Sequence, residues 1–270
     1  MEYYERLKKH VSDIRKITDF EPEVAIVLGS GLGNFADNID VECEISYRDL
    51  EGFPFSTAPG HDGKFIFGYL AGKKVVCMKG RVHYYEGYEM SEVVLPMRVM
   101  YLLGARTAII TNAVGGMNKE MPEGSFIVIE DAIVSLVPSP LRGPNLDELG
   151  ERFPDVSELY DPKLIEKALK VGKENNITIN KGIFIQLSGP QYETKSEIKM
   201  YRQLGADIAG MSSGVEAVAA HHMGMKVCGV SCMTNYCTGV SDHKLSGDEV
   251  LEIANRVSGE FEKLIIGIVK

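Results

Sequence analysis

The chain lacks the features that would place it in a membrane, outside the cell or on nucleic acid. No apolar run approaches the roughly 20 residues of a membrane-spanning helix. The opening residues MEYYERLKKH lack the apolar core of a secretory signal. Positive charge is scarce, because 29 Lys and Arg face 38 Asp and Glu, for a net charge of −9. This balance argues against general affinity for nucleic acid or anionic membranes, so we expect a cytoplasmic enzyme.

Paired cysteines are also lacking. None of the five cysteines forms the C-x-x-C pair of a structural zinc site. Cys228, Cys232 and Cys237 lie near His221 and His222 in the sequence, but their strand-like surroundings indicate burial as small apolar residues. We therefore expect buried or free thiols and no metal site.

The composition is that of a globular protein with a sizeable core, since 44% of the 270 residues are hydrophobic and 25% are charged. Strand-like runs alternate with amphipathic helices, and we find no linker and no repeat. The pattern predicts a single α/β domain over residues 1–270, built as three layers in which a mixed, twisted sheet is flanked by helices.

Individual elements follow from periodicity and from helix caps. Strands are expected at 24–28, 64–79 (a hairpin with a Gly-Lys turn), 107–111, 125–137, 182–187, 207–211 and 226–234. Helices are expected before Pro22 and at 91–103, 161–175, 194–204, 213–223 and 246–264, the last four beginning at the caps Asp161, Thr194, Ser213 and Ser246. Glu197, Glu216 and Glu249 are the capping-box partners expected for the last three caps. Residues 112–116 are expected to form a glycine loop and 138–160 a long surface loop.

Residues 24–33, VAIVLGSGLG, place a buried strand directly before a turn with glycines at 29, 31 and 33. Such a turn can direct several backbone N–H groups at one anion, and Ser30 adds a hydroxyl donor. The turn therefore predicts a site of phosphate size. A nicotinamide or flavin dinucleotide site is weakened as an alternative, because Asn34 stands where that fingerprint has its third glycine. A tight turn without a ligand stays open as a third interpretation.

Polar residues follow the strand at 75–79, at the sheet edge where ligands of α/β proteins bind. Arg81, His83 and Tyr85 would face one side if the backbone stays extended. The planar arginine fork suits phosphate oxygens, and histidine can donate to them or accept a proton. The alternative is a polar strand end that makes surface pairs.

Three later strand ends carry groups that suit a nucleobase or an anion. Tyr192 and Glu193 place an aromatic ring beside a carboxylate. This pair suits a heterocycle that stacks on the ring and donates an N–H hydrogen bond to the carboxylate. Glu193 is also explained as an ordinary acid in the first turn of a helix. Met211 and Ser212 precede a helix start, where backbone N–H groups suit an anion. Asn235 offers a donor and an acceptor together. Each of these residues also has an ordinary structural explanation.

Together the motifs resemble those of the trimeric purine nucleoside phosphorylases. They are GSGLG at 29–33, PGH at 59–61, RVHYYEG at 81–87, TNAVGG at 111–116, LRGPN at 141–145, GPQYET at 189–194, GMSS at 210–213 and MTNY at 233–236, in the family's order. The resemblance implies reversible phosphorolysis of 6-oxopurine nucleosides (inosine, guanosine) to free base and (deoxy)ribose 1-phosphate. Inorganic phosphate would be the co-substrate, with no metal or organic cofactor.

The resemblance also implies residue roles. Phosphate would be held by Ser30, His61, Arg81, His83, Ser212 and the backbone N–H of Ala113. The nucleoside would be held by Tyr85, Phe153 and Met211 at the sugar and by Tyr192, Glu193 and Asn235 at the purine. His83, Glu193 and Asn235 would be the catalytic residues, because cleavage leaves cationic character on the ribose and negative charge on the base.

Phe153 and Gly247 need separate treatment. Phe153, in the long loop, matches an aromatic that the family sends into a neighbouring subunit's sugar site, which implies a homotrimer. Gly247 stands where many relatives have a histidine that reaches the sugar 5′-hydroxyl, and His243 is the residue that could replace it. The alternatives kept are a 5′-methylthioadenosine phosphorylase, which Glu193 argues against, and a nucleoside-binding protein without catalysis.

Overall fold

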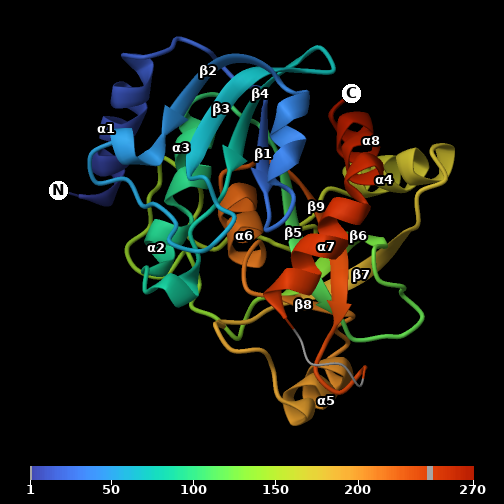
Figure 1. Ribbon diagram of the computed structural model, residues 1–270. Helices are drawn as coiled ribbons and strands as arrows, with labels where there is room; N and C mark the ends of the chain where they lie inside the picture. The colour runs from blue at the N-terminus through green and yellow to red at the C-terminus, as the bar shows by residue number, and fades with distance from the viewer. Residues whose placement is uncertain (1, 242–245) are drawn as a thin grey trace.

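The computed structural model describes residues 2–241 and 246–270, and its centre is a nine-stranded mixed sheet (Figure 1). The strands are β1 (Val24–Leu28), β2 (Asp40–Ser46), β3 (Lys64–Leu70), β4 (Lys73–Lys79), β5 (Thr107–Gly116), β6 (Phe126–Ile133), β7 (Ile179–Gln186), β8 (Ile208–Gly210) and β9 (Lys226–Tyr236). Their order is β2-β3-β4-β1-β5-β8-β7-β6-β9. The predicted α/β class with a mixed sheet is confirmed.

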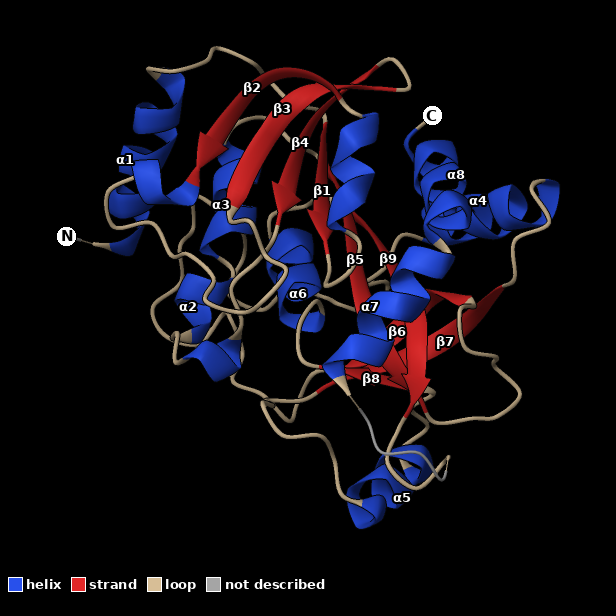
Figure 2. Ribbon diagram, in the orientation of Figure 1, coloured by secondary structure: helices blue, strands red, loops and turns tan. Residues whose placement is uncertain are grey.

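Helices cover both faces of the sheet (Figure 2). They are α1 (Tyr3–Arg15), α2 (Met90–Val93), α3 (Leu95–Leu102), α4 (Pro162–Glu174), α5 (Lys195–Gln203), α6 (Gly214–His222), α7 (Gly247–Arg256) and α8 (Ser258–Val269). Short 3-10 turns lie at Gly33–Asn38, Tyr47–Asp49 and Tyr84–Glu86. None of the described helices is both long and apolar enough to cross a membrane.

Strand β1 lies at the centre of the sheet because all five of its residues are buried and it pairs in parallel with β4 on one side and β5 on the other. β5 also pairs in parallel with β9. The carboxyl ends of these four strands therefore meet at one edge of the sheet. This edge brings the predicted motifs together.

The strand pairing contains a closure that the sequence did not predict. β5 pairs with both β8 and β9, and these connect through β7 and β6, so the five strands form a closed ring. The expected glycine loop at 112–116 is wrong for this reason: these residues continue β5 and pair with β8 and β9. A Cβ on Gly116 would lie 2.2 Å from the end of the Met233 side chain, which would have to move.

Two expected helices are interrupted. The helix expected at 91–103 is divided into α2 and α3 at Val94, and Pro96 lies in the first turn of α3, where its missing N–H is tolerated. The helix expected at 246–264 is divided into α7 and α8 at Val257, beside the weak helix formers Ser258 and Gly259.

Smaller differences concern single turns and one missed strand. The turn between β3 and β4 is Ala71-Gly72, both with positive φ, instead of Gly-Lys. Helix α1 ends at Arg15, which leaves Ile17 exposed. Strand β2 was missed because most of its residues are exposed, so its sequence has no buried alternation. Other caps are confirmed: Asp161 accepts hydrogen bonds from two N–H groups of α4, and Thr194 forms the reciprocal box with Glu197 of α5.

Candidate active site

A cavity at the shared carboxyl edge of the sheet is lined by all of the predicted site residues except His61 and Phe153. These lining residues are Ser30, Arg81, His83, Tyr85, Ala113, Tyr192, Glu193, Met211, Ser212 and Asn235. They come from segments more than 200 residues apart in the chain. The loops that follow β1, β4, β7, β8 and the end of β9 therefore build one site.

The glycine turn after β1 is held against β5. A Cβ on Gly29 would lie 2.6 Å from the Asn112 Cα, and the Gly29 N–H donates to the Thr111 hydroxyl at 3.3 Å. Gly31 has φ +76°, and a Cβ there would meet Ala254 of α7. Only glycine permits this close approach, which places Ser30 on the cavity wall.

His61 lies behind Ser30 and orients it. The Arg81 backbone N–H donates to Nδ1 of His61 at 3.1 Å, so the imidazole proton is on Nε2, which lies 3.1 Å from the Ser30 Oγ. Burial, assisted by the neighbouring His83 and Arg81, lowers the pKa of His61 to about 3. The ring is therefore neutral at pH 7. Because His61 donates to Ser30, the serine proton is free for a ligand in the cavity.

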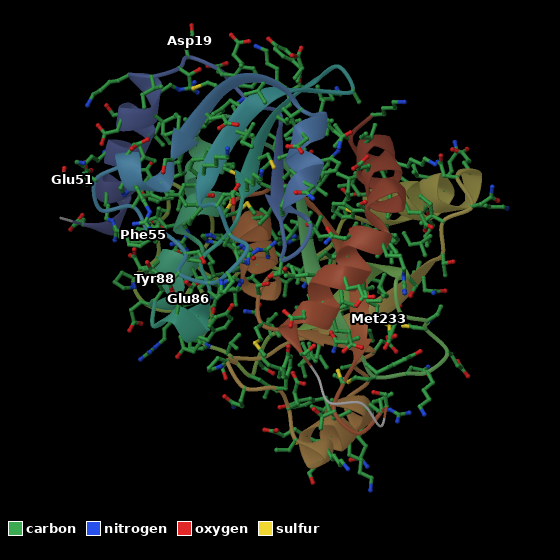
Figure 3. The ribbon with its side chains drawn as sticks, viewed as in Figure 1. Asp19, Glu51, Phe55, Glu86, Tyr88 and Met233 are labelled. Atoms are coloured by element: carbon green, nitrogen blue, oxygen red, sulfur yellow. The ribbon has the colours of Figure 1, made fainter. Side chains whose placement is uncertain are left out.

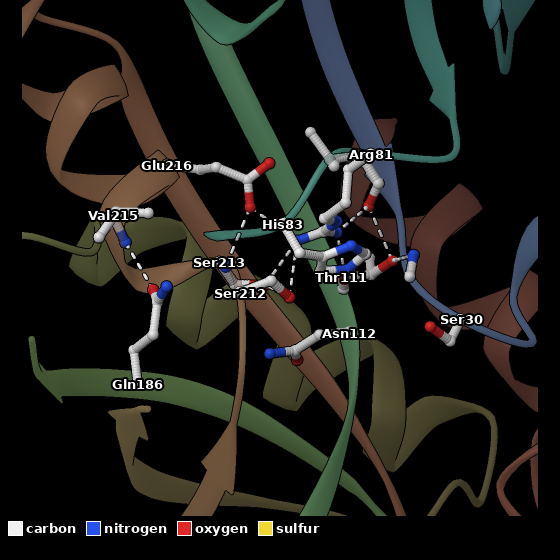
Figure 4. Close-up of polar contacts among 12 residues, drawn as sticks. Ser30, Arg81, His83, Thr111, Asn112, Gln186, Ser212, Ser213, Val215 and Glu216 are labelled. Carbon is white, nitrogen blue, oxygen red and sulfur yellow. Dashed lines mark hydrogen bonds and ion pairs between the residues drawn. The ribbon is translucent and has the colours of Figure 1, made fainter. Parts of the chain in front are cut away.

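Arg81 is 1% exposed and reaches across the sheet edge (Figure 4). Its Nη1 donates to the Ser213 hydroxyl and to a carboxylate oxygen of Glu216, each at 2.7 Å, and lies 3.3 Å from the Ser212 Oγ. Its Nη2 donates to the Thr111 carbonyl oxygen. The Nε of Arg81 is buried and has no hydrogen-bond partner among the residues that the structure describes. The guanidinium thus has a fixed position beside Ser212 at the cavity wall.

The alternation of Arg81, His83 and Tyr85 suggested an extended backbone, but Tyr84–Glu86 form a 3-10 turn instead. The three side chains nevertheless all line the cavity, and the His83 and Tyr85 rings stack at 4.7 Å. Nδ1 of His83 lies 2.9 Å from a Glu86 carboxylate oxygen. That contact orients the ring and directs the other ring nitrogen away from Glu86.

Glu86 is a residue whose role the sequence reasoning missed. It lies near Phe55 and Tyr88 (Figure 3) and accepts hydrogen bonds from the His83 N–H and the Thr57 hydroxyl. Burial would raise its pKa, but the hydrogen bonds from His83 and Thr57 outweigh burial and lower the pKa to about 2. Its position inside RVHYYEG was a signal that could have identified it.

The other end of the cavity carries the groups that suit a base. Asn235 is 7% exposed, and its Oδ1 accepts from the Thr234 hydroxyl at 3.0 Å while its Nδ2 donates to the Tyr236 carbonyl at 3.2 Å. Burial raises the pKa of Glu193, and Tyr192 is 43% exposed. The cavity therefore has hydroxyl and cationic donors at one end and an amide with a carboxylate at the other.

Phe153 does not line this cavity, and the residue is 83% exposed. Gly247 is the first residue of α7, and a Cβ there would meet nothing within 4 Å. Val250, one turn further along α7, does line the cavity. His243 lies outside the described residues.

Other lining residues were not predicted. They are Asn112, Val114, Gly115, Ala209, Gly210, Thr234, Cys237 and Val250. Asn112 and Thr234 stand inside quoted motifs, which was a usable signal, whereas Cys237 and Val250 had none. Burial raises the pKa of the Cys237 thiol, so this lining group stays protonated.

A second cavity lies between α1, α3, the loop at 140–148 and the end of α6. Its volume is about 660 Å³, whereas the cavity lined by the predicted site residues has a volume of about 170 Å³. The second cavity mixes Arg98 and Arg142 with Glu2, Glu5 and Glu148, and it contains none of the predicted site residues. Within residues 2–241 and 246–270, no group of three or more His, Cys, Asp or Glu side chains could hold a metal. The smaller cavity is therefore the candidate active site.

Comparison with known proteins agrees with this geometry. The family described as the phosphorylase superfamily matches residues 23–270. Purine nucleoside phosphorylase 1 of Bacillus subtilis (strain 168) is 42% identical over 265 residues, which cover 98% of each chain.

Solved structures of Schistosoma mansoni purine nucleoside phosphorylase also match the fold. The complex with adenosine has a TM-score of 0.93 and 38% identity, covering 98% of this chain and 96% of that one. The complex with inosine has a TM-score of 0.92 and 37% identity, covering 98% and 95%. The chain therefore belongs to the phosphorylase superfamily and, within it, to the purine nucleoside phosphorylases.

Proposed function

We propose that the protein catalyses the reversible phosphorolysis of 6-oxopurine nucleosides to free base and (deoxy)ribose 1-phosphate. One observation carries the proposal: a single cavity holds Ser30, Arg81, His83 and Ser212 at one end and Glu193 with Asn235 at the other. The first group suits an anion and the second a purine. A nucleoside between them would place its glycosidic bond beside the phosphate.

The chemistry needs no group beyond the two substrates and these side chains. As the glycosidic bond breaks, the ribose gains cationic character and the purine gains negative charge. Phosphate held by the donors of Ser30, Ser212 and Arg81 stabilises the cationic ribose. The Asn235 amide stabilises the negative charge on the purine by donating a hydrogen bond to it, and one such hydrogen bond typically stabilises a transition state by ~3 to 4 kcal/mol.

Glu193 supports the 6-oxopurine specificity. A carboxylate accepts from the N1–H of hypoxanthine or guanine, whereas adenine presents a lone pair at N1. The same reasoning argues against a 5′-methylthioadenosine phosphorylase, which must bind a 6-aminopurine.

The proposed assembly is a homotrimer. The support is Phe153, a large apolar ring that is exposed in its own chain and lies on the long loop at 138–160. Covering it with a second copy of the chain would remove apolar surface from water and would complete the sugar site of the neighbour.

The test is release of hypoxanthine or guanine from inosine or guanosine, with and without inorganic phosphate. We expect base release that depends on phosphate and a strong loss of it in Ser212→Ala, whereas the exposed serine variant Ser12→Ala behaves as the wild type. Equal rates in both buffers would indicate a hydrolase. Nucleoside binding without base release would indicate a binding protein.

A further inference from the structure

The buried carboxylate of Glu216 contacts the phosphate end of the cavity from behind, and the proposed reaction does not use it. Glu216 is 1% exposed and lies in the first turn of α6. It was expected only as half of a capping box with Ser213. The capping box is present, with the Ser213 N–H donating to Glu216 Oε2 at 2.9 Å, but the same carboxylate oxygen also accepts from Arg81, and so does the Ser213 hydroxyl.

One carboxylate oxygen thus joins two segments of the site. Glu216 Oε2 accepts from Arg81 Nη1, which follows β4, and from the Ser213 N–H, which follows β8 (Figure 4). Ser213 has φ +82°, a conformation unfavourable for a residue with a Cβ, and this hydrogen bond helps to hold it there. The neighbouring Ser212 is held with it at the cavity wall.

Charge gives Glu216 a second role. Arg81 carries a guanidinium cation, and the residue is 1% exposed. Glu216 is the acidic side chain that pairs with it, at 2.7 Å. A buried cation without such a partner is strongly unfavourable and would move toward water or toward other acceptors.

We propose that Glu216 is a positioning residue for the phosphate end of the site. It holds the Arg81 guanidinium and the Ser212-Ser213 turn in one arrangement before phosphate binds. This inference rests on the proposed phosphorolysis. It predicts that Glu216 affects phosphate binding through Arg81 and leaves nucleoside binding unchanged, since Glu193 and Asn235 lie at the other end of the cavity.

The first test is Glu216→Gln, with Asp207→Asn as the matched control. Asp207 is a partly buried carboxylate whose Oδ2 accepts from the Ile183 N–H, and it does not line the cavity. In Glu216→Gln the KM for phosphate should rise about tenfold or more, as expected for loss of a charge-assisted hydrogen bond. The KM for inosine should stay within about twofold of the wild type. The control should change neither value.

Two further variants keep the test decisive if Glu216→Gln does not fold, as judged by circular dichroism. Glu216→Asp keeps the charge, but its shorter side chain cannot reach both Arg81 and the Ser213 N–H, so the phosphate KM alone should rise. Arg81→Met/Glu216→Gln removes both partners of the buried ion pair. Because no guanidinium remains to be positioned and only the Ser213 contact is lost, Glu216→Gln should raise the phosphate KM less in the Arg81→Met background than in the wild type.

Three results would overturn the proposal. They are a phosphate KM within about twofold of the wild type in the folded Glu216 variants, an equal rise in both KM values, and an effect of Glu216→Gln on the phosphate KM that is as large in the Arg81→Met background as in the wild type. The wild type separates this inference from the proposed function: if it releases base only with phosphate while the variants fail the test, phosphorolysis stands and the role of Glu216 falls.

Discussion

At the scale of single residues, Glu193 should decide which purine is accepted. An unmatched polar contact in a buried site typically costs ~1 to 3 kcal/mol and more for a charged group, so the wild type should prefer inosine to adenosine by more than about tenfold. Glu193→Gln can donate to the N1 of adenine and should reduce that preference by about tenfold. The measurement is kcat/KM for both nucleosides. The exposed Glu252→Gln on α7 is the control.

The raised pKa of Glu193 adds a pH dependence to this selectivity. Because burial raises the pKa, the carboxylate is protonated at a higher pH than an ordinary glutamate as the solution is acidified. Protonated Glu193 accepts a hydrogen bond from N1–H poorly, so kcat/KM for inosine should fall as the pH is lowered. The preference for inosine over adenosine should fall with it. A preference that stays constant through the acid limb would contradict this role.

Glu86 should contribute to stability in a pH window set by its pKa. Its side chain is 3% exposed, and its pKa is lowered from 4.5 to about 2, so its contribution is complete above pH 4.5 and is lost as the pH falls toward 2. With allowance for solvent screening, the contribution is about 2 kcal/mol. Glu86→Gln should lose this free energy of unfolding at pH 7 and little at pH 2, as measured by urea denaturation.

Glu89→Gln is the control for that measurement, because Glu89 is exposed and its side chain makes no capping hydrogen bond. It should leave the unfolding free energy near the wild-type value at both pH values. A Glu86→Gln variant as stable as Glu89→Gln at pH 7 would refute the assignment.

At the scale of elements, the first turn of α7 should set the tolerance at the sugar 5′ position. Val250 lines the cavity, and Gly247, one turn earlier, offers no side chain there and has open space around its Cβ position. A neutral hydrogen bond is worth roughly 0.5 to 1.5 kcal/mol net. Since Gly247 cannot make it, the wild type should discriminate weakly between inosine and 5′-deoxyinosine. It should also accept 5′-thioethers of 6-oxopurine nucleosides.

Gly247→His should raise the preference for inosine over 5′-deoxyinosine several-fold. Gly247→Ala is the matched control, because it removes the glycine without supplying a donor and should leave the preference unchanged. A strong wild-type preference that Gly247→His does not alter would show that another group already contacts the 5′-hydroxyl.

At the scale of the whole molecule, the proposed trimer should be visible in mass and in kinetics. A chain of 29.8 kDa should elute as a particle of about 90 kDa in size-exclusion chromatography with light scattering. Phe153→Ala should raise the KM for inosine about tenfold, since burying a phenylalanine ring typically contributes ~1.5 to 3 kcal/mol. A monomeric wild type, or a trimeric Phe153→Ala variant with unchanged KM, would contradict the role of Phe153.

The α/β class, the glycine turn, the caps at Asp161 and Thr194 and most of the residues that line the cavity could be predicted from the amino-acid sequence. These features depend on local physics: apolar periodicity identifies buried strands, glycines mark required backbone angles, and polar residues at strand ends collect at one sheet edge. The resemblance of the motifs supplied individual roles that single residues could not, because Asn235 alone is equally well explained as a turn residue.

Features that depend on contacts between distant segments could not be predicted and became evident in the folded chain. Residues 112–116 were expected to form a glycine loop, but they continue strand β5. Their hydrogen-bond partners in β9 lie about 120 positions later in the chain. The tautomer of His61 follows from a backbone N–H at Arg81. Glu216 was expected only as the capping-box partner of Ser213, and its contact with Arg81 spans 135 positions. Local periodicity carries no information on such pairings, which are set by how the sheet brings its strand ends together.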